Sequence, residues 1–334
     1  MKNPRDILVN AAILCASLLV FFIAAETVTR LVISRSAPNR EVSMKRIFVP
    51  LDGPRVYGLR PGASFLGYRI NSLGLRDDEV SVEKPAGTVR IISLGDSIAF
   101  GQGVKDKDDV VSEVIEALAP RRLGRPVEVV NAGVPGYNTA QELAYLEERL
   151  LKLDPDLVIL HVCLNDADPV ELEHETQTLF TPPSDLEGYN LNIRTLVNMS
   201  YFLRLVKAKL LALSPSLRNR AVNMRVGEAA WSAMKERMAR MKQLLDGRGV
   251  GLLVLIYPWQ VQLEVDRAAV EPQKDLGRFL EEAGIEYIDL YDRFKAAAAE
   301  GAPLFFEDGV HPTEKGHAIA ARAALEAVVS GLGP

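Results

Sequence analysis

The sequence has few cysteines and few histidines, and it lacks a strong excess of charge of either sign. Two cysteines among 334 residues, Cys15 and Cys163, exclude a disulfide framework and a cysteine-based zinc site. With 39 basic and 44 acidic residues and no long basic run, the chain lacks the electrostatic footprint of a nucleic-acid-binding protein. The four histidines must therefore carry any imidazole chemistry.

Apolar residues are not scarce, since they make up 48% of the chain, and this excludes wholesale disorder. The mean hydropathy of +0.05 is high for a soluble enzyme. Part of the excess lies at the start, where the run from Ile7 to Ala25 carries no charge. As a helix with a rise of about 1.5 Å per residue, this run nearly spans the hydrocarbon core of a bilayer, about 30 Å.

We therefore predict a signal anchor over residues 1–33 that is not cleaved. Lys2 and Arg5 precede the run and favour a cytoplasmic N-terminus, with the bulk of the chain on the extracytoplasmic (periplasmic) side of the membrane. A signal peptide cleaved after Ala25 is the alternative, although Ile23 is a poor small residue for a cleavage site. Cys15 lacks small residues before it, so lipoprotein acylation is not predicted.

After a connector at residues 34–88, short apolar runs alternate with helical patterns. The pattern predicts a doubly wound, flavodoxin-like α/β domain at residues 89–334, with a five-stranded parallel sheet and helices on both faces. A helical insertion interrupts it at residues 167–226. Strands are expected at Val89–Leu94, Val127–Val130, Leu157–Val162, Leu252–Ile256 and Ile285–Leu290. Helices are expected at Asp109–Leu118, Thr139–Leu153, Glu228–Leu245, Pro272–Ala283 and Glu314–Val329.

In such a sheet, sites form beyond the carboxyl ends of the strands. The first strand runs into Gly95-Asp96-Ser97, which places Ser97 at the corner between strand and helix. Its hydroxyl is either a nucleophile or the cap of the next helix. The nearby glycines do not form a phosphate loop, because no Lys-Ser/Thr ending follows and the dinucleotide spacing is absent.

The other strand ends carry further candidate groups. Gly133 follows the second strand and allows close backbone approach to a bound oxygen, although it could be an ordinary turn glycine. Asn165 follows the third strand and could donate its amide or form a plain turn. Asp308 stands three residues before His311, so its carboxylate can orient the imidazole. An exposed loop histidine is the ordinary alternative for that pair.

In this order, these residues resemble the SGNH (GDSL-type) hydrolase family over residues 89 to 330. Ser97 matches the first block, Gly133 the second, Asn165 the third, and Asp308 with His311 the last. The stretch Asn71–Asp77, by itself a turn between short strands, is similar to the lead-in of membrane-anchored bacterial members. Two positions depart from the family pattern, namely Ile98 in place of leucine and Cys163 in place of glycine. We interpret His161, His174 and His317 as structural.

The resemblance implies a serine ester hydrolase of the cell envelope, esterase- or lipase-like or a carbohydrate deacetylase, that forms an acyl-enzyme. His311 would take the proton of Ser97 and Asp308 would orient His311. The N–H groups of Ser97 and Gly133 and the amide of Asn165 would form the oxyanion hole. No metal or organic cofactor is expected. The partners are an acylated small molecule, lipid or glycan as substrate and the membrane, with no nucleic acid.

Two other functions fit the same site. An O-acyltransferase would pass the acyl group to a cell-surface polysaccharide, and it would need a separate membrane partner to deliver the acyl donor. A non-catalytic envelope assembly protein would keep only the fold. The segment Leu191–Leu213 of the insertion is a lid, an amphipathic helix near lipid, or a helical pair packed on the sheet edge, and we favour the last.

Overall fold

The computed structural model describes residues 4–34, 47–167, 200, 202–203, 206 and 227–333. The chain divides into two compact units, one of Met1–Met44 with Pro183–Arg218 and one of Lys45–Pro182 with Asn219–Pro334. The predicted insertion at 167–226, with His174 and the segment Leu191–Leu213, lies outside the described residues except for residues 167, 200, 202, 203 and 206. The predicted domain limits at residues 33 and 88 stay predictions.

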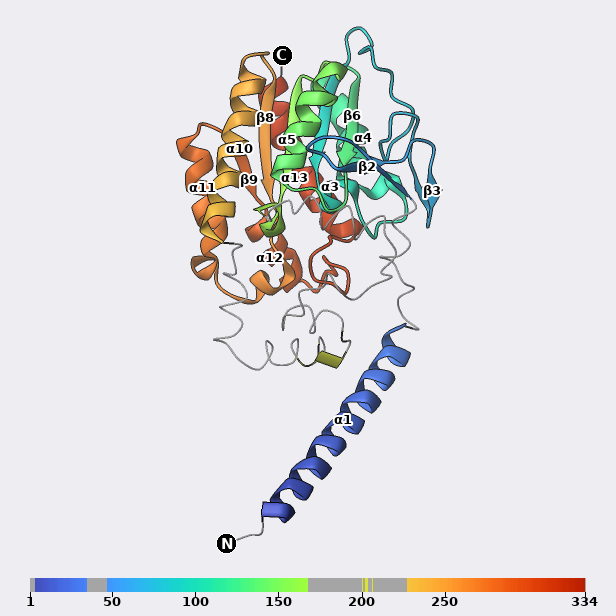
Figure 1. Ribbon diagram of the computed structural model, residues 1–334. Coiled ribbons are helices and arrows are strands. Elements are labelled where there is room, and N and C mark those ends of the chain that lie inside the picture. The colour runs from blue at the N-terminus through green and yellow to red at the C-terminus, as the bar shows by residue number, and fades with distance from the viewer. Residues whose placement is uncertain are drawn as a thin grey trace. The chain divides into compact units, whose positions relative to one another are not determined.

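A five-stranded parallel sheet forms the centre of the larger unit (Figure 1). Its order is β6-β5-β7-β8-β9, so the second strand in the sequence lies at one edge and the first lies beside it. This is the flavodoxin-like order of a doubly wound sheet, and the predicted fold class is confirmed. The strands are β5 (Val89–Gly95), β6 (Val127–Gly133), β7 (Leu157–Val162), β8 (Gly251–Ile256) and β9 (Glu286–Asp289).

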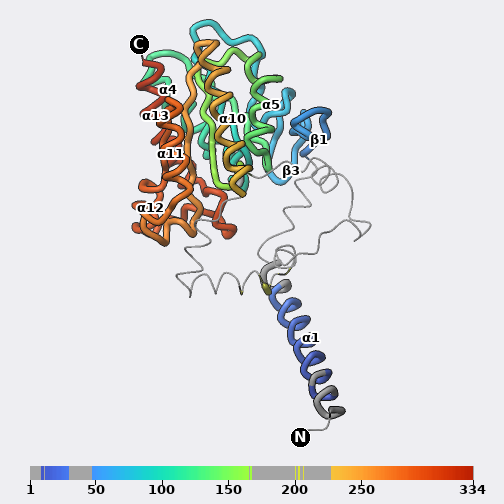
Figure 2. The backbone as a smooth tube through the Cα atoms, turned by 60° about the vertical axis from the view of Figure 1, so that its left-hand side comes forward, coloured from blue at the N-terminus to red at the C-terminus, as the bar shows by residue number. Residues whose placement is uncertain are grey.

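Both faces of the sheet are buried, which explains the nearly continuous apolar strands. In β5, Ile91 packs in a core cluster with Val111 and Ala324, while Ile92 points to the opposite face and is also fully buried. Figure 2 shows α4 (Val111–Leu123) and α13 (Glu314–Leu332) on one side of the sheet, and α5 (Thr139–Glu148) and α10 (Glu228–Asp246) on the other.

Most helices begin and end close to their predicted positions. The predicted apolar face of α10 is confirmed, because Trp231, Met234, Met238 and Met241 are all buried. The helix predicted to end at Leu153 is shorter in the structure, because α5 ends at Glu148 and a 3-10 turn follows. In the described residues of the larger unit, the other α-helices are α3 (Ser97–Phe100), α11 (Glu271–Glu282) and α12 (Tyr291–Ala299), of which the first and last were not predicted.

Residues 47–88 belong to the larger unit and fold with it. Two short antiparallel pairs precede the turn at residues 71–77, as the turn reading of that stretch predicts. They are β1 (Phe48–Pro50) with β2 (Tyr57–Leu59) and β3 (Ser64–Phe65) with β4 (Tyr68–Arg69). Tyr57 and Tyr68 are buried, and their rings pack edge-on against Tyr137 and Phe100, so this stretch joins the core of the sheet.

The smaller unit contains the apolar helix α1 (Pro4–Ser34), whose window Ala12–Thr29 is long and apolar enough to cross a membrane. This finding fits a membrane anchor or a signal sequence. Within the same unit, Glu26 of α1 accepts hydrogen bonds from Ser200 Oγ at 2.7 Å and from the Phe202 N–H at 3.0 Å. The ring of Phe202 stands edge-on to Phe21 and Phe22.

Candidate active site

The strand β5 delivers Ser97 to the carboxyl edge of the sheet. Asp96 is the N-cap of α3, because its Oδ1 accepts the Ile98 N–H at 2.8 Å. Ser97 is therefore the first helical residue, and the alternative in which Ser97 caps the helix is wrong. At 8% exposure Ser97 is buried but not sealed. The turn leaves its hydroxyl at the beginning of a helix, where backbone N–H groups have no helical acceptor.

A tight loop before α13 holds Asp308 and His311 together. Phe305 and Pro312 form an isolated antiparallel bridge that closes the loop, and Gly309 sits within it at a φ of +71°. Asp308 Oδ1 accepts the N–H of Val310 and the N–H of His311, each at 2.9 Å. Its other oxygen, Oδ2, lies 2.8 Å from His311 Nδ1. The carboxylate thus fixes both the backbone and the ring of the histidine.

The second ring nitrogen of His311 meets the serine. His311 Nε2 lies 2.8 Å from Ser97 Oγ, although the two residues are 214 positions apart in the sequence. An ionised carboxylate only accepts hydrogen bonds, so Asp308 requires the proton of the neutral imidazole to be on Nδ1. Nε2 is then free to accept the hydroxyl proton of Ser97. The three predicted residues are brought together in one chain of hydrogen bonds.

Asp308 is charged at neutral pH. Burial raises the pKa of its carboxyl, but the hydrogen bonds from the ring and backbone of His311, together with the charge of His311, outweigh burial and lower it to about 2. A carboxylate held in this way stabilises a protonated imidazole, which is the state a general base reaches after taking a proton.

Gly133 ends β6 behind the serine, and its main contacts are with the helix. A Cβ at this position would come within 2.1 Å of the Phe100 nitrogen, so only glycine lets α3 pack on this strand. The Gly133 N–H already donates to Asn131 Oδ1 at 3.1 Å. Three residues later, Gly136 is exposed in the loop after β6, at a φ of +83°.

Asn165 lies in the 3-10 turn Leu164–Ala167 that follows β7, but its side chain lies outside the part of the chain that the structure describes. Hydrogen bonds hold the turn in place. Asp166 Oδ2 accepts the Cys163 N–H at 2.6 Å, and Thr139 Oγ1 donates to the Asp166 carbonyl at 3.3 Å. Cys163 is 3% exposed and is packed as a small buried residue.

Acidic groups gather beneath this edge of the sheet. Asp96, Cys163 and Asp166 each bring one possible ligand atom within 4.8 Å of the others. The hydrogen bonds of Asp96 to Ile98 and of Asp166 to Cys163 assign both carboxylates to the turns after β5 and β7. Glu142 of α5 is fully buried, and burial, then the nearby charge of Asp96, raises the pKa of its carboxyl well above the usual range.

A second serine–histidine pair lies inside the sheet. Ser93 Oγ is 2.8 Å from His161 Nε2, and His161 Nδ1 is 3.0 Å from the hydroxyl of Tyr257. Both members are 1% exposed, and burial lowers the pKa of His161 to about 3, so the ring is neutral. His317 on α13 is likewise fully buried. These contacts support the structural roles predicted for His161 and His317.

The sequence model of the GDSL-like lipase/acylhydrolase family matches residues 93–319. No curated protein matches the chain. A solved two-domain esterase active on acetylated mannans is 15% identical with a TM-score of 0.45, and the match covers 75% of this chain and 52% of that one. The chain thus spans about half the length of that esterase.

Two further solved structures are similar over their whole length. A variant of an acetyl xylan esterase from Geobacillus stearothermophilus is 15% identical, with 76% of this chain and 99% of that chain covered and a TM-score of 0.46. A lipase/acylhydrolase from Enterococcus faecalis is 17% identical, with 74% and 98% covered and a TM-score of 0.45.

Proposed function

Because the chain belongs to the GDSL-like lipase/acylhydrolase family and is an ester-bond hydrolase, we propose that Ser97 is its nucleophile, His311 its general base and acid, and Asp308 the residue that orients His311. One observation carries this proposal. Ser97 Oγ, the two nitrogens of His311 and the Asp308 carboxylate form a continuous relay with two links of 2.8 Å.

The relay performs both halves of ester hydrolysis. His311 Nε2 takes the Ser97 proton while Oγ attacks the carbonyl carbon, and the protonated ring then gives that proton to the leaving alcohol as the ester C–O bond breaks. A water molecule next attacks the acyl-enzyme and loses its proton to Nε2. The ring returns this proton to Ser97 Oγ as the acid departs, so the enzyme is restored.

The proposed oxyanion hole consists of the Ser97 N–H, the side-chain amide of Asn165 and a backbone N–H from the end of β6 or from the loop that follows it. Gly133, the last residue of β6, supplies that N–H only by releasing Asn131 Oδ1, whereas Gly136 is an exposed residue of the loop. Removing one such donor costs about 3 kcal/mol in the barrier.

The apolar helix α1 supports a location at the membrane, with the catalytic unit on the extracytoplasmic side of the cell envelope. The substrate class is an acyl ester borne by a small molecule, a lipid or a glycan. The same acyl-enzyme can pass its acyl group to a sugar hydroxyl instead of water. In that case hydrolysis is the side reaction and a membrane partner supplies the donor.

The test is hydrolysis of p-nitrophenyl acetate by the full chain in detergent, with Ser97→Ala beside the matched variant Ser93→Ala. We expect Ser97→Ala to lower kcat by about 10³-fold or more, because no other group takes the acyl chain. Ser93→Ala loses only the bond to buried His161 and keeps kcat within about tenfold. Parent-level activity in Ser97→Ala contradicts the proposal, and acyl transfer to an oligosaccharide that exceeds hydrolysis selects the transferase.

A further inference from the structure

Residues 47–79 reach the two loops that follow β5 and β6. The hydroxyl of Tyr57 donates to the Pro135 carbonyl at 2.9 Å, and the hydroxyl of Tyr137 donates back to the Tyr57 carbonyl. The Gly103 N–H donates to the hydroxyl of Tyr68 at 2.8 Å. The stretch before the sheet therefore holds the segment that carries Ser97 and the loop after β6.

Arg76 makes the most direct of these contacts. It is 2% exposed, and its Nη1 donates to the carbonyls of Phe100 at 2.7 Å and Gly101 at 2.6 Å. Its Nη2 donates to the Val104 carbonyl at 2.8 Å. The guanidinium carbon lies 4.6 Å from the centre of the Tyr68 ring. One buried side chain thus gathers three carbonyls at the end of α3, the helix that begins with Ser97.

The contact with Arg76 satisfies a hydrogen-bond acceptor at the end of the short helix α3. Because α3 has only four residues, no helical N–H donates to the carbonyl of its last residue, Phe100, which is buried away from water. A planar guanidinium carries several N–H donors in one fork and places a positive charge at the carboxyl end of the helix, where it is favourable. Burial lowers the pKa of Arg76 to about 10, so the group stays charged at neutral pH.

The next residue holds the neighbouring strand. Asp77 Oδ2 accepts the Asn131 N–H at 2.8 Å, and Asn131 Oδ1 in turn accepts the Gly133 N–H. Asn131 Nδ2 donates to Ser112 Oγ at 3.3 Å, which ties the same strand to α4. Two consecutive residues before the sheet therefore hold α3 through Arg76 and the end of β6 through Asp77.

We propose that the segment Asn71–Asp77 is a positioning element of the active site and that Arg76 is its positioning residue, which holds α3 so that Ser97 Oγ stays at His311 Nε2. The inference rests on the proposed role of Ser97. A shift of α3 of about 1 Å would open the 2.8 Å contact and slow proton transfer without removing any catalytic group.

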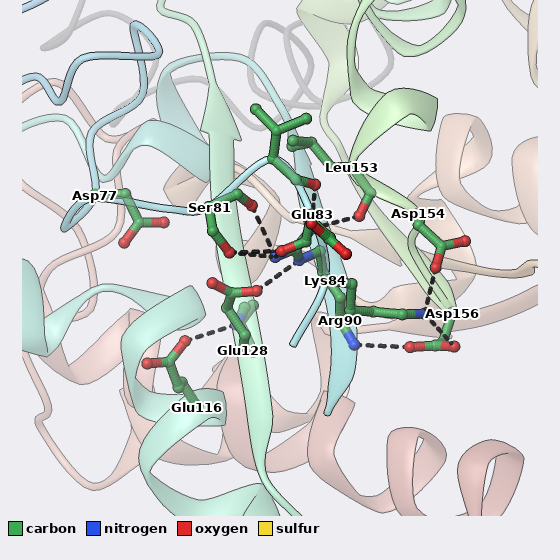
Figure 3. A network of polar contacts seen from close by, with 12 residues as sticks. Asp77, Ser81, Glu83, Lys84, Arg90, Glu116, Glu128, Leu153, Asp154 and Asp156 are labelled. Carbon is green, nitrogen blue, oxygen red and sulfur yellow. Dashed lines mark hydrogen bonds and ion pairs between the residues drawn. The ribbon is translucent and has the colours of Figure 1, made fainter. Parts of the chain in front are cut away.

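Arg90 provides a matched control, because it is also a buried arginine that donates to carbonyls. Figure 3 shows its network, in which Nη1 donates to the Leu153 carbonyl at 2.6 Å, Nη2 to the Ser81 carbonyl at 2.9 Å and Nε to Glu128 at 2.5 Å. Arg90 lies at the opposite end of β5 from Ser97, about 20 Å away along an extended strand. It tests the cost of losing a buried arginine without touching α3.

The experiment compares Arg76→Lys with Arg90→Lys in the full chain. A fluorophosphonate probe measures the rate at which Ser97 is labelled, p-nitrophenyl acetate gives kcat and KM, and thermal unfolding gives Tm. We expect Arg76→Lys to lower the labelling rate and kcat at least tenfold with KM within about twofold, since one ammonium cannot hold three carbonyls. Arg90→Lys should lower Tm and keep both rates within about twofold.

The positioning role is overturned if Arg76→Lys keeps the labelling rate and kcat of the parent. It is also overturned if Arg76→Lys and Arg90→Lys lose activity equally, or if both fail to fold. Failure of Arg76→Lys to fold while Arg90→Lys folds also overturns it, because Arg76 is then needed for the whole fold. Ser97→Ala separates the two proposals. Activity that survives in Ser97→Ala contradicts the nucleophile, whereas its loss beside an unchanged Arg76→Lys contradicts only the positioning role.

Discussion

Asp308 forms three hydrogen bonds with one loop, two to backbone N–H groups and one to the His311 ring. Asp308→Asn keeps the shape of the side chain but offers an amide in place of one oxygen. We expect kcat for p-nitrophenyl acetate to fall about 10²- to 10⁴-fold, because the amide favours the wrong imidazole tautomer and no longer stabilises the protonated ring.

The control for that change is Asp292→Asn, which removes an exposed carboxylate 3.6 Å from Arg267 and far from the serine in the sequence. It should keep the parent kcat. A kcat for Asp308→Asn within threefold of the parent would show that Asp308 does not orient His311 during the reaction.

Gly133 gives a prediction about packing. In Gly133→Ala the new Cβ meets the Phe100 nitrogen at 2.1 Å and the Ala99 carbonyl carbon at 2.6 Å, and backbone atoms cannot move aside cheaply. We expect the free energy of unfolding, measured by urea denaturation, to fall by about 3 kcal/mol or more. Gly331→Ala is the control, since Gly331 lies in α13 with no atom within 4 Å of a Cβ and should be neutral or slightly stabilising.

Some of these residues could be predicted from the sequence and others could not. Ser97 follows directly after an apolar strand, and Asp308 stands one turn before His311, so short patterns reveal them. Arg76 is 24 residues from Phe100, and no pattern in the sequence joins a turn residue to the end of a later helix. The Gly133 N–H was predicted to be a donor of the oxyanion hole, and the sequence could not show that Asn131 Oδ1 already accepts from it.

The turn that carries Arg76 and Asp77 is an element with its own pH dependence. Burial raises the pKa of the Asp77 carboxyl to about 8, although the Asn131 N–H opposes this. Between about pH 4 and pH 8 the folded chain therefore keeps a proton that the unfolded chain has lost. The contribution of this group to the free energy of unfolding then falls as the pH rises through that window.

Asp77→Asn removes the titrating proton. The free energy of unfolding of the variant, minus that of the parent, should therefore increase between about pH 5 and pH 8. Urea denaturation of both proteins at three pH values across this range measures the difference. A difference that is flat or that decreases with pH contradicts the assignment.

Whether a helix or strand could be predicted from the sequence depends on how many of its side chains are buried and in what pattern. The strands β5 to β8 are largely buried, and their nearly continuous apolar runs made them predictable from the sequence. The helix α12 is alanine-rich, and only Tyr291 and Phe294 are buried, so it lacks a long apolar period. The strands β1 to β4 are two or three residues long, too short for an alternating pattern to show in the sequence.

The whole chain combines an apolar helix with a catalytic unit, and this predicts how it partitions. The full chain should stay with membranes during carbonate extraction, because α1 exposes an apolar surface that needs lipid. Replacing both Leu18 and Leu19, each about 60% exposed, by aspartate should release it into the soluble fraction. A soluble parent protein whose measured mass corresponds to a chain that starts after Ala25 would show a cleaved signal peptide instead.

The account as a whole depends on Ser97 as the group that takes the acyl chain. The most direct measurement treats the full chain with a fluorophosphonate and locates the adduct by peptide mass spectrometry. Because His311 Nε2, the proposed base, lies 2.8 Å from Ser97 Oγ, the account predicts one adduct on the peptide that contains Ser97, and its loss in His311→Ala. An adduct on Ser93 or another residue, or no adduct on folded protein, would contradict it.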